Sequence, residues 1–541
     1  MSGDTSVRPS QLSAACEMFV RDQLQLDVLG TKDSELWLYA RRPRRVVASS
    51  IERLNAVRLS SLSGRPVQQM LDRANLSVSE LQEHLAQTSG RHSLDGYTPR
   101  GAGLYRDDDH LLIISGNQAC RWNGRQKTPI MSPIYKHDIL EFNPAYELIP
   151  QLDHVLSEAT TLTHPQARVI WKELVDLIKQ WRWVQLGAAS WLAGQILATI
   201  LQSTWTWKAH TYLCARRNTG KSTFLEMLAE LLRPMVFLFS GDTTEAAIRQ
   251  SLGTREHYLL LDEFERNHER DRILRLLRPA NHGGMVAKGS PSGHAHTFHV
   301  SQLAWLASID RPGDSAADSS RYLTFELHPV TAAQKAVTLP SRFQLARLRR
   351  NLYRLAFKYF RQFWEAADTL KALPDTGLDG RMLDAIAVPA GIWAAVGGVN
   401  PVDLLHATAH LWRPLLDDQI IEDEFALLRD ILQVKLKTNE IQTNRPEWRT
   451  IGDGLAMDYA FRALEAYGVK RTFTQQRMDI AAFSPEAVRR HCLAGTKWAH
   501  LNIRDLLLRL PGATATRLRM AGMDNARVVV IPMRTIYELQ A

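Results

Sequence analysis

The feature that most constrains the fold of this chain is a short apolar strand that runs into a glycine–lysine loop and then into a helix. Residues 211–214 have the composition of a buried strand, residues 215–223 read ARRNTGKST, and an apolar helical pattern follows over 224–232. The loop fits the pattern GxxxxGK[ST] except at its first position, where Ala215 replaces glycine. This order predicts a parallel α/β sheet with the loop at the carboxyl end of a strand.

The loop itself predicts a phosphate-binding site. Successive backbone N–H groups in such a loop point at phosphate oxygens, and the helix N-terminus adds partial positive charge. Lys221 would reach the β- and γ-phosphates of a nucleotide, the Ser222 hydroxyl would ligate Mg²⁺, and alanine at 215 fits if its φ stays negative. The residues expected to contact the nucleotide are Ala215, Asn218, Thr219, Gly220, Lys221, Ser222 and Thr223.

A second strand pattern ends in two acids. Residues 258–261 are apolar and are followed by Asp262 and Glu263. Ligands of open α/β sheets bind at the carboxyl ends of strands, so we expect Asp262 to hold Mg²⁺ and Glu263 to polarise the attacking water. The plainer interpretation is an acidic turn after a strand, which the P-loop upstream disfavours.

Two further patterns complete a candidate catalytic set. The apolar strand over 303–309 ends at Asp310, and either Ser308 or Asp310 would sense a γ-phosphate. Arg321 precedes the next apolar strand. It is either an arginine finger that acts across a subunit boundary or an ordinary structural arginine.

A predicted hairpin over residues 285–300 has a Gly/Ser/Pro-rich tip. Lys288, His294 and His296 lie near that tip and would suit a nucleic-acid backbone. The spacing alone fits a plain surface hairpin equally well.

With these residues in order, the stretch 191–329 resembles the superfamily-three helicases of phages, plasmids and prophages, and most closely the helicase-like ATPase halves of phage primase-helicases. The resemblance implies an AAA+-like ATPase that uses ATP and Mg²⁺. It also implies a ring, usually a hexamer, that moves on single-stranded or forked DNA beside other replication proteins. In that ring the hairpin would line the pore, and Arg321 would stand at the arginine-finger position. The chain departs from the family at Ala215, which is usually glycine, and at Asp310, which is usually asparagine.

The regions around this stretch predict further domains, because the chain of 541 residues exceeds the usual size of one domain. Residues 1–90 look mostly helical with short strand candidates, and the Gly- and Asp-punctuated runs over 95–150 predict a meander in which residues 107–109 form a hairpin turn and no metal site. The tryptophans at 171–207 fit core positions. A weak resemblance at the C-terminus suggests a winged-helix-like domain, whose basic residues would either touch DNA or form a solvated surface: Lys470, Arg471, Arg489, Arg490, Arg517 and Arg519.

These patterns give one predicted architecture: an α/β fold with a P-loop, AAA+-like parallel-sheet core, helical flanks, a small N-terminal α+β region and a C-terminal winged-helix-like domain. The predicted domains are an N-terminal accessory domain (1–160), the ATPase core with its leading helices (161–335), a helical region (336–440) and the C-terminal domain (441–541).

Composition limits the location of the chain. Its four cysteines are scattered and form no CxxC pair, which disfavours zinc or disulfides and suits a reducing compartment. The N-terminus lacks the apolar core of a secretion signal, and the longest apolar stretch, 191–201, is too short to span a bilayer. We therefore expect a soluble cytoplasmic protein with no membrane partner. The formal net charge of +9 permits nucleic-acid binding.

The predicted function is an ATPase that acts as a DNA helicase or translocase of a phage or mobile element. The alternative is an ATP-switched DNA-binding assembly or defence protein without unwinding activity. No polymerase-type carboxylate pair or zinc finger indicates a primase.

Overall fold

The computed structural model describes residues 9–289, 295–309, 321–328, 337–412 (without 375, 377 and 379), 423–439, 446–456, 462–474, 477–496, 498–499, 502–520 and 523–540. The chain forms two compact units. The first contains Met1–Gly313 and Ser320–Arg413, and the second contains Asp314–Ser319 and Pro414–Ala541. The predicted domain boundaries stay a prediction.

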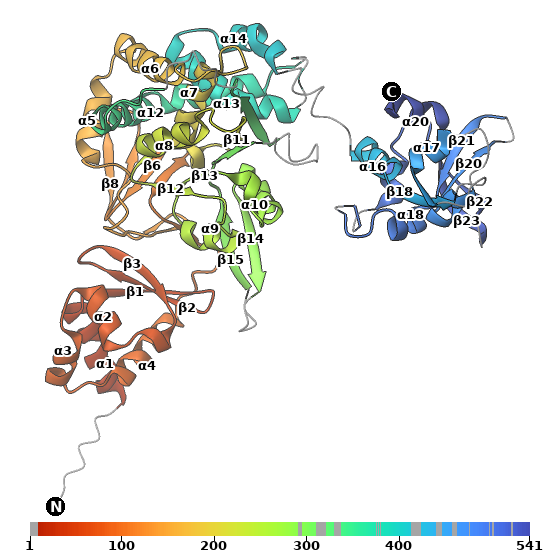
Figure 1. The fold of residues 1–541 in the computed structure, drawn as a ribbon. Coiled ribbons are helices and arrows are strands. Elements are labelled where there is room, and N and C mark those ends of the chain that lie inside the picture. The colour runs from red at the N-terminus through yellow and green to blue at the C-terminus, as the bar shows by residue number, and fades with distance from the viewer. Residues whose placement is uncertain are drawn as a thin grey trace, which may run out of the picture. The chain divides into compact units, whose positions relative to one another are not determined.

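The N-terminal part of the first unit packs four helices against a three-stranded antiparallel sheet in the order β1-β2-β3 (Figure 1). Asn75, in the left-handed region at φ 52°, ends one helix, and a Ser77–Glu80 capping box begins the next. The elements are α1 (Pro9–Met18), β1 (Leu26–Lys32), β2 (Glu35–Ala40), β3 (Arg45–Ser49), α2 (Ala56–Ser63), α3 (Val67–Ala74) and α4 (Val78–Ser89).

The predicted meander is confirmed. Strands β5 (Gly103–Asp107), β6 (His110–Ser115), β7 (Gln118–Trp122) and β8 (Lys127–Ile130) form an antiparallel sheet in chain order. The aspartates turn the β5–β6 hairpin, with Asp108 at φ 56°. Three short strands form a neighbouring sheet: β4 (Thr98–Arg100), β9 (Ile134–Tyr135) and β10 (Asp138–Leu140).

Asp107 of that hairpin is buried in an ion-pair network, because it pairs with Lys136 and lies 2.6 Å from Arg121. Among the described residues, no group of His, Cys, Asp and Glu side chains is arranged to hold a metal ion.

A five-stranded parallel sheet, in the order β12-β13-β16-β11-β17, is the core of the first unit. Four of its strands are mostly apolar and almost entirely buried, as a parallel sheet covered by helices requires, and the edge strand β12 is apolar but half-buried, with Leu238 44% exposed. This sheet confirms the predicted α/β fold with a parallel-sheet core. The strands are β11 (His210–Cys214), β12 (Val236–Phe239), β13 (Tyr258–Leu261), β16 (Ala304–Ser308) and β17 (Tyr322–Glu326).

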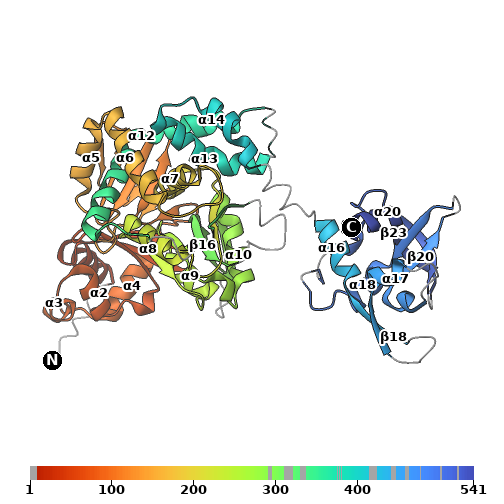
Figure 2. The ribbon, with the colours of Figure 1, turned by 45° about the horizontal axis from the view of Figure 1, so that its top comes forward.

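Helices from before and after the sheet in sequence pack together. Gly194 of α7 (Ala188–Ile200) lies so close to Pro389 of α13 (Gly380–Gly397) that an added β-carbon would be 2.5 Å from the Pro389 carbonyl oxygen. Figure 2 shows α7, α13 and α14 together. The remaining helices of the unit are α5 (Leu152–Thr161), α6 (His164–Ile178), α8 (Lys221–Leu232), α9 (Glu245–Leu252), α10 (Arg270–Leu277), α12 (Arg342–Lys371) and α14 (Pro401–Thr408).

The predicted basic hairpin is present as a two-stranded antiparallel ribbon, β14 (Gly284–Gly289) and β15 (Ala295–Val300). Its tip, residues 290–294, lies outside the described residues.

The second unit contains a four-stranded antiparallel sheet in the order β20-β21-β23-β22. Two helices, α18 and α19, connect β21 to the β22–β23 hairpin. The unit thus has an antiparallel sheet, and the winged-helix-like assignment stays a prediction. Its elements are α16 (Asp423–Leu432), β18 (Lys435–Asn439), β19 (Pro446–Thr450), α17 (Ile451–Ala456), β20 (Val469–Phe473), β21 (Asp479–Phe483), α18 (Pro485–His491), α19 (Ile503–Leu507), β22 (Thr514–Met520), β23 (Met523–Pro532) and α20 (Met533–Gln540). Across the described part of both units, no helix combines the length and apolarity needed to cross a bilayer.

Candidate nucleotide site

The glycine–lysine loop leaves the carboxyl end of β11 and enters α8, as the sequence predicts. Asn218 (φ 62°) and Gly220 (φ 90°) both lie in the left-handed region, which curls the backbone ahead of the helix. Ala215 has no positive φ, is 6% exposed, and donates its backbone N–H to the Ser308 carbonyl at 3.1 Å. The alanine therefore meets the condition that φ stays negative.

Lys221 begins α8, and its side chain folds back over the loop. Its ammonium donates to the carbonyl oxygens of Ala215 and, at 3.2 Å, of Arg216. Burial lowers the pKa of Lys221, while the carboxylates of Glu265 and Asp262 act in the opposite direction. The cation is thus held at the loop by carbonyl dipoles and nearby acids.

The other loop residues differ in exposure. Thr219 is 8% exposed, and its hydroxyl donates to the Arg216 carbonyl at 2.9 Å, which braces the loop internally. Ser222 and Asn218 are exposed, and Thr223 is half-buried. Ser222 is therefore open to an incoming ligand, as a Mg²⁺ ligand in this position must be.

The acidic pair lies at the carboxyl end of β13. Asp262 donates its backbone N–H to the Phe239 carbonyl at 2.9 Å, and its carboxylate accepts the N–H of Glu263 at 2.8 Å. Glu263 is exposed and has a φ of 50°. A non-glycine residue in the left-handed region costs on the order of 1–3 kcal/mol and is typical of functional sites.

Sequence reasoning missed Glu265. Its carboxylate accepts the backbone N–H of Ile309 at 3.3 Å, at the end of β16, and its charge acts on Lys221. In the sheet β16 stands between β11 and β13, so Glu265 connects the acidic loop to the strand end between the two motifs. The second glutamate in the run Asp-Glu-Phe-Glu was the available signal.

Sequence reasoning also missed the role of Trp181. This residue is 3% exposed, so its predicted place in the core is confirmed, but its indole N–H donates to the Gly220 carbonyl at 2.9 Å. Its ring meets Phe224 of α8 edge-on at 5.1 Å. A β-carbon on Gly220 would lie 3.1 Å from the indole nitrogen, a tight contact, and the positive φ of 90° favours glycine there.

The segment that follows Trp181 continues along β17. Val184 donates its N–H to the Glu326 carbonyl at 2.8 Å, and Glu326 donates its own N–H to the Gln185 side chain at 2.9 Å. This segment therefore joins the phosphate loop to the strand that follows Arg321.

The structure does not bring Arg321 to the loop of its own chain. β11 and β17 run parallel, with His210 beside Tyr322 and Cys214 beside Glu326. Arg321 precedes Tyr322 and so lies at the amino edge of the sheet, about 13 Å along the strand from the loop. A catalytic role for Arg321 stays a prediction and requires a neighbouring chain.

The remaining predicted residues are placed only in part. Ser308 is fully buried at the end of β16, and Asp310 lies outside the described residues. Lys288 and His296 pair in register across the β14–β15 ribbon, while His294 lies outside the described residues. Nucleic-acid binding by the three residues stays a prediction.

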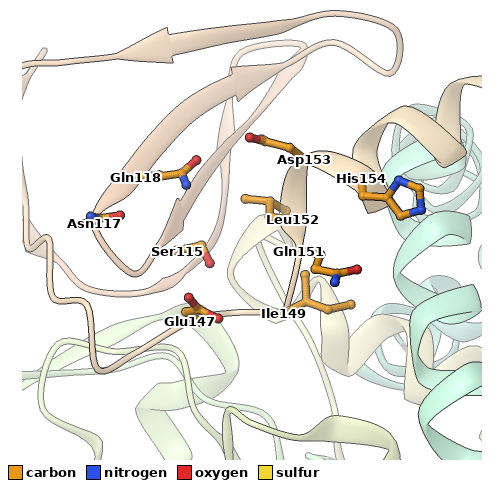
Figure 3. A pocket seen from close by; sticks show the side chains of 9 residues that line it. All are labelled: Ser115, Asn117, Gln118, Glu147, Ile149, Gln151, Leu152, Asp153 and His154. Atoms are coloured by element: carbon orange, nitrogen blue, oxygen red, sulfur yellow. The ribbon is translucent and has the colours of Figure 1, made fainter.

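A cavity of about 570 Å³ lies elsewhere in the first unit, between the β6–β7 turn and the start of α5. Figure 3 shows the side chains of Asn117 and Gln118 on one side and of Gln151 and Asp153 on the other. None of the predicted nucleotide-site residues lines this cavity.

The geometry of the loop fits ATP and Mg²⁺. The N-terminus of α8, the left-handed residues of the loop and the Lys221 ammonium suit a polyphosphate. The Ser222 hydroxyl and the Asp262 carboxylate are hard oxygen donors of the kind that Mg²⁺ prefers.

Comparison with known proteins adds little to these observations. No family model matches the sequence, and no curated protein matches it. Among solved structures, the chain is similar to one described as "SCCmec type IV Cch - active helicase", with 12% identity, 94% of this chain and 92% of that chain covered, and a TM-score of 0.45. At this identity and TM-score the similarity establishes neither fold nor function, and the fold class rests on the sheet and loop described above.

Proposed function

We propose that this chain hydrolyses ATP with Mg²⁺ and uses the cycle to move on single-stranded DNA as a ring of identical subunits, in the manner of a helicase. The observation that carries this proposal is the order of the parallel sheet. It brings the phosphate loop, the acidic pair and the end of β16 to one edge and leaves Arg321 at the other.

Each residue at the carboxyl edge of the sheet would have a distinct role in ATP binding and hydrolysis. Lys221 would exchange its carbonyl partners for phosphate oxygens, and Ser222 and Asp262 would hold the metal ion. Bound Mg²⁺ neutralises phosphate charge. Glu263, exposed at the strand end, would orient the attacking water.

The position of Arg321 supports a ring. A head-to-tail ring places the amino edge of one sheet near the carboxyl edge of the next, so that each site takes an arginine from its neighbour. The β14–β15 ribbon would face the DNA in such a ring, with Lys288, His294 and His296 as the contact residues.

The test is ATP hydrolysis with and without single-stranded DNA, in the native chain and in Glu263→Gln. Glu226→Gln is the matched control, because Glu226 is an exposed acid on α8 outside the site. We expect stimulation by DNA that Glu263→Gln abolishes and Glu226→Gln leaves intact. Retained ATP binding without turnover in the native chain would overturn the helicase proposal in favour of an ATP-switched assembly.

Subunit mixing tests the ring. Lys221→Ala and Arg321→Ala should each be inactive alone. Their equimolar mixture should recover about a quarter of native activity, because random pairing across a heterologous interface then joins an intact loop to an intact arginine at some sites. A mixture as inactive as its parts would contradict the role of Arg321 between subunits.

A further inference from the structure

The C-terminal unit contains a basic pocket of about 760 Å³. It is formed by α18, the start of α19 and the β22–β23 hairpin, elements that lie together in the blue part of Figure 1. Its lining has one acidic residue, Glu486, among the described residues. We define the arginine pocket by its exposed basic residues, which are Arg489, Arg490, Arg504, Arg517 and Arg527.

Two of these arginines face each other. Arg517 of β22 and Arg527 of β23 are direct partners in the antiparallel register. Like charges directly opposite one another destabilise a strand pair. The hairpin therefore carries a repulsion that a bound anion would relieve.

The same unit neutralises other basic residues internally. Arg471 forms a 2.5 Å ion pair with Asp479, and Lys470 lies 3.1 Å from Glu465. Within the described residues, the side chains of Arg517 and Arg527 form no hydrogen bond or ion pair with the protein. Lys470 and Arg471 are thus neutralised by carboxylates of the same unit, whereas Arg517 and Arg527 are not. This difference indicates that the arginine pair is a surface for an external anion.

The same holds for the helix side of the pocket. Arg490 at the end of α18 and Arg504 in α19 have no side-chain partner in the described part of the chain. Arginines from both helices and from the hairpin thus converge on one concave surface, which a single phosphate would not occupy fully.

The rest of the lining identifies the anion. Thr516 and Asn525 add a hydroxyl and an amide donor, which together with arginine forks are the groups that contact phosphate and sugar in protein–DNA interfaces. The described lining residues include no aromatic side chain, whereas sites for single strands stack bases on aromatic rings. The chemistry therefore favours a stacked duplex, contacted through its backbone.

We propose that the arginine pocket binds the phosphate backbone of double-stranded DNA, on a different unit from the one that holds the nucleotide site. This binding goes beyond the proposed helicase function, because it requires neither ATP nor a single strand. It would hold duplex DNA independently of the ATPase cycle.

The experiment measures binding of a short fluorescent duplex of mixed sequence to the full chain without nucleotide, over a series of salt concentrations. We expect Arg517→Gln/Arg527→Gln to weaken binding on the order of tenfold at low salt and to make the slope of log K against log salt shallower by about 1.8, or about 0.9 for each lost charge. Arg490→Gln/Arg504→Gln should have a similar effect from the helix side.

The matched control is Arg509→Gln/Arg534→Gln, which removes the same charge from exposed arginines of the same unit outside the pocket. Because the substitutions lie in the C-terminal unit, far-UV circular dichroism and thermal unfolding of every variant report whether that unit is folded. Selective loss of duplex binding in the two pocket variants supports the proposal, even if the chain fails to unwind DNA.

Four results would overturn it. Unchanged duplex binding in both pocket variants would show that the arginine pocket does not bind DNA. An equal loss of binding in the control variant would show that only the net charge of the unit matters. Displacement of the duplex by polyglutamate as readily as by unlabelled duplex would assign the pocket to an acidic protein segment. Tighter binding of single-stranded than of duplex DNA through these arginines would exclude duplex DNA as the preferred ligand of the pocket.

Discussion

Positive charge is partly buried and close to carboxylates at the carboxyl edge of the parallel sheet, but it is exposed in the arginine pocket of the C-terminal unit. At the sheet edge, Lys221 is partly buried, bonded to the carbonyls of its own loop and near the carboxylates of Asp262 and Glu265. In the arginine pocket, Arg517 and Arg527 are exposed and face each other. The first arrangement suits the proposed nucleotide, a small ligand in a fixed geometry, and the second suits the proposed duplex, an extended polyanion.

The largest expected difference between the nucleotide site and the arginine pocket is in the variant Lys221→Ala. Under the proposed function, loss of the loop cation should abolish ATP binding and lower ATP turnover by at least about a hundredfold, because Lys221 would be the cation that contacts the phosphates. Duplex binding without nucleotide should stay unchanged. Calorimetric titration of ATP and the duplex assay measure the two effects, and a parallel loss of both would show that the regions do not act separately.

A fall in pH should destabilise the parallel sheet of the first unit but leave the charge of the arginine pocket unchanged. His210 is fully buried in β11, where its Nε2–H donates to the Leu277 carbonyl at 3.0 Å and its Nδ1 accepts the N–H of Ala304 at 3.0 Å. Protonation of Nδ1 would break the second bond. Burial accordingly lowers the pKa of His210 from 6.5 to about 4, whereas arginine does not titrate.

The unfolded chain therefore binds more protons than the folded chain between pH 6.5 and about 4, and the free energy of unfolding falls as the pH falls through that window. We expect a loss of about 2 kcal/mol from His210 at pH 5. Urea unfolding at pH 7 and pH 5 measures it. In His210→Asn the stability at pH 7 should be lower and its decrease towards pH 5 smaller; an equal decrease would exclude His210 as the cause.

A smaller effect is expected from Trp181→Phe. The substitution keeps an aromatic ring beside Phe224 but removes the hydrogen bond to the Gly220 carbonyl, worth about 1 kcal/mol. ATP should bind about fivefold more weakly, as follows from that energy. Trp183→Phe is the control, because the indole of Trp183 donates to Ile178 and not to the loop. Equal ATP affinity in both variants would contradict a positioning role for Trp181.

The smallest effect is expected from Ala215→Gly, which restores the residue usual in such loops. Since Ala215 has no positive φ, glycine relieves no strain, and the added freedom of the unfolded chain should lower stability by about 0.5–1 kcal/mol. ATP turnover should change less than twofold. A large gain in turnover would show that alanine restrains the loop.

Local sequence patterns were sufficient to predict the phosphate loop, the acidic pair and the β meander. Each consists of residues adjacent in the chain, and the turn or strand end that they need is encoded by neighbours such as Gly220 and Asp108. The parallel sheet could also be predicted, because apolar strands that alternate with helices must be buried on both faces.

The tertiary structure alone decided how distant segments meet. The contact of Trp181 with Gly220, the contact of Glu265 with Ile309 and the facing pair of Arg517 and Arg527 depend on strand order and register. None of these is set by spacing along the chain. Sequence reasoning grouped Lys470 and Arg471 with the other basic residues of the C-terminal domain. In the structure those two have carboxylate partners, whereas Arg517 and Arg527 have none among the described residues. Adjacent residues carry a pattern that the sequence displays, but the distribution of charge over a surface is set only when the chain has folded.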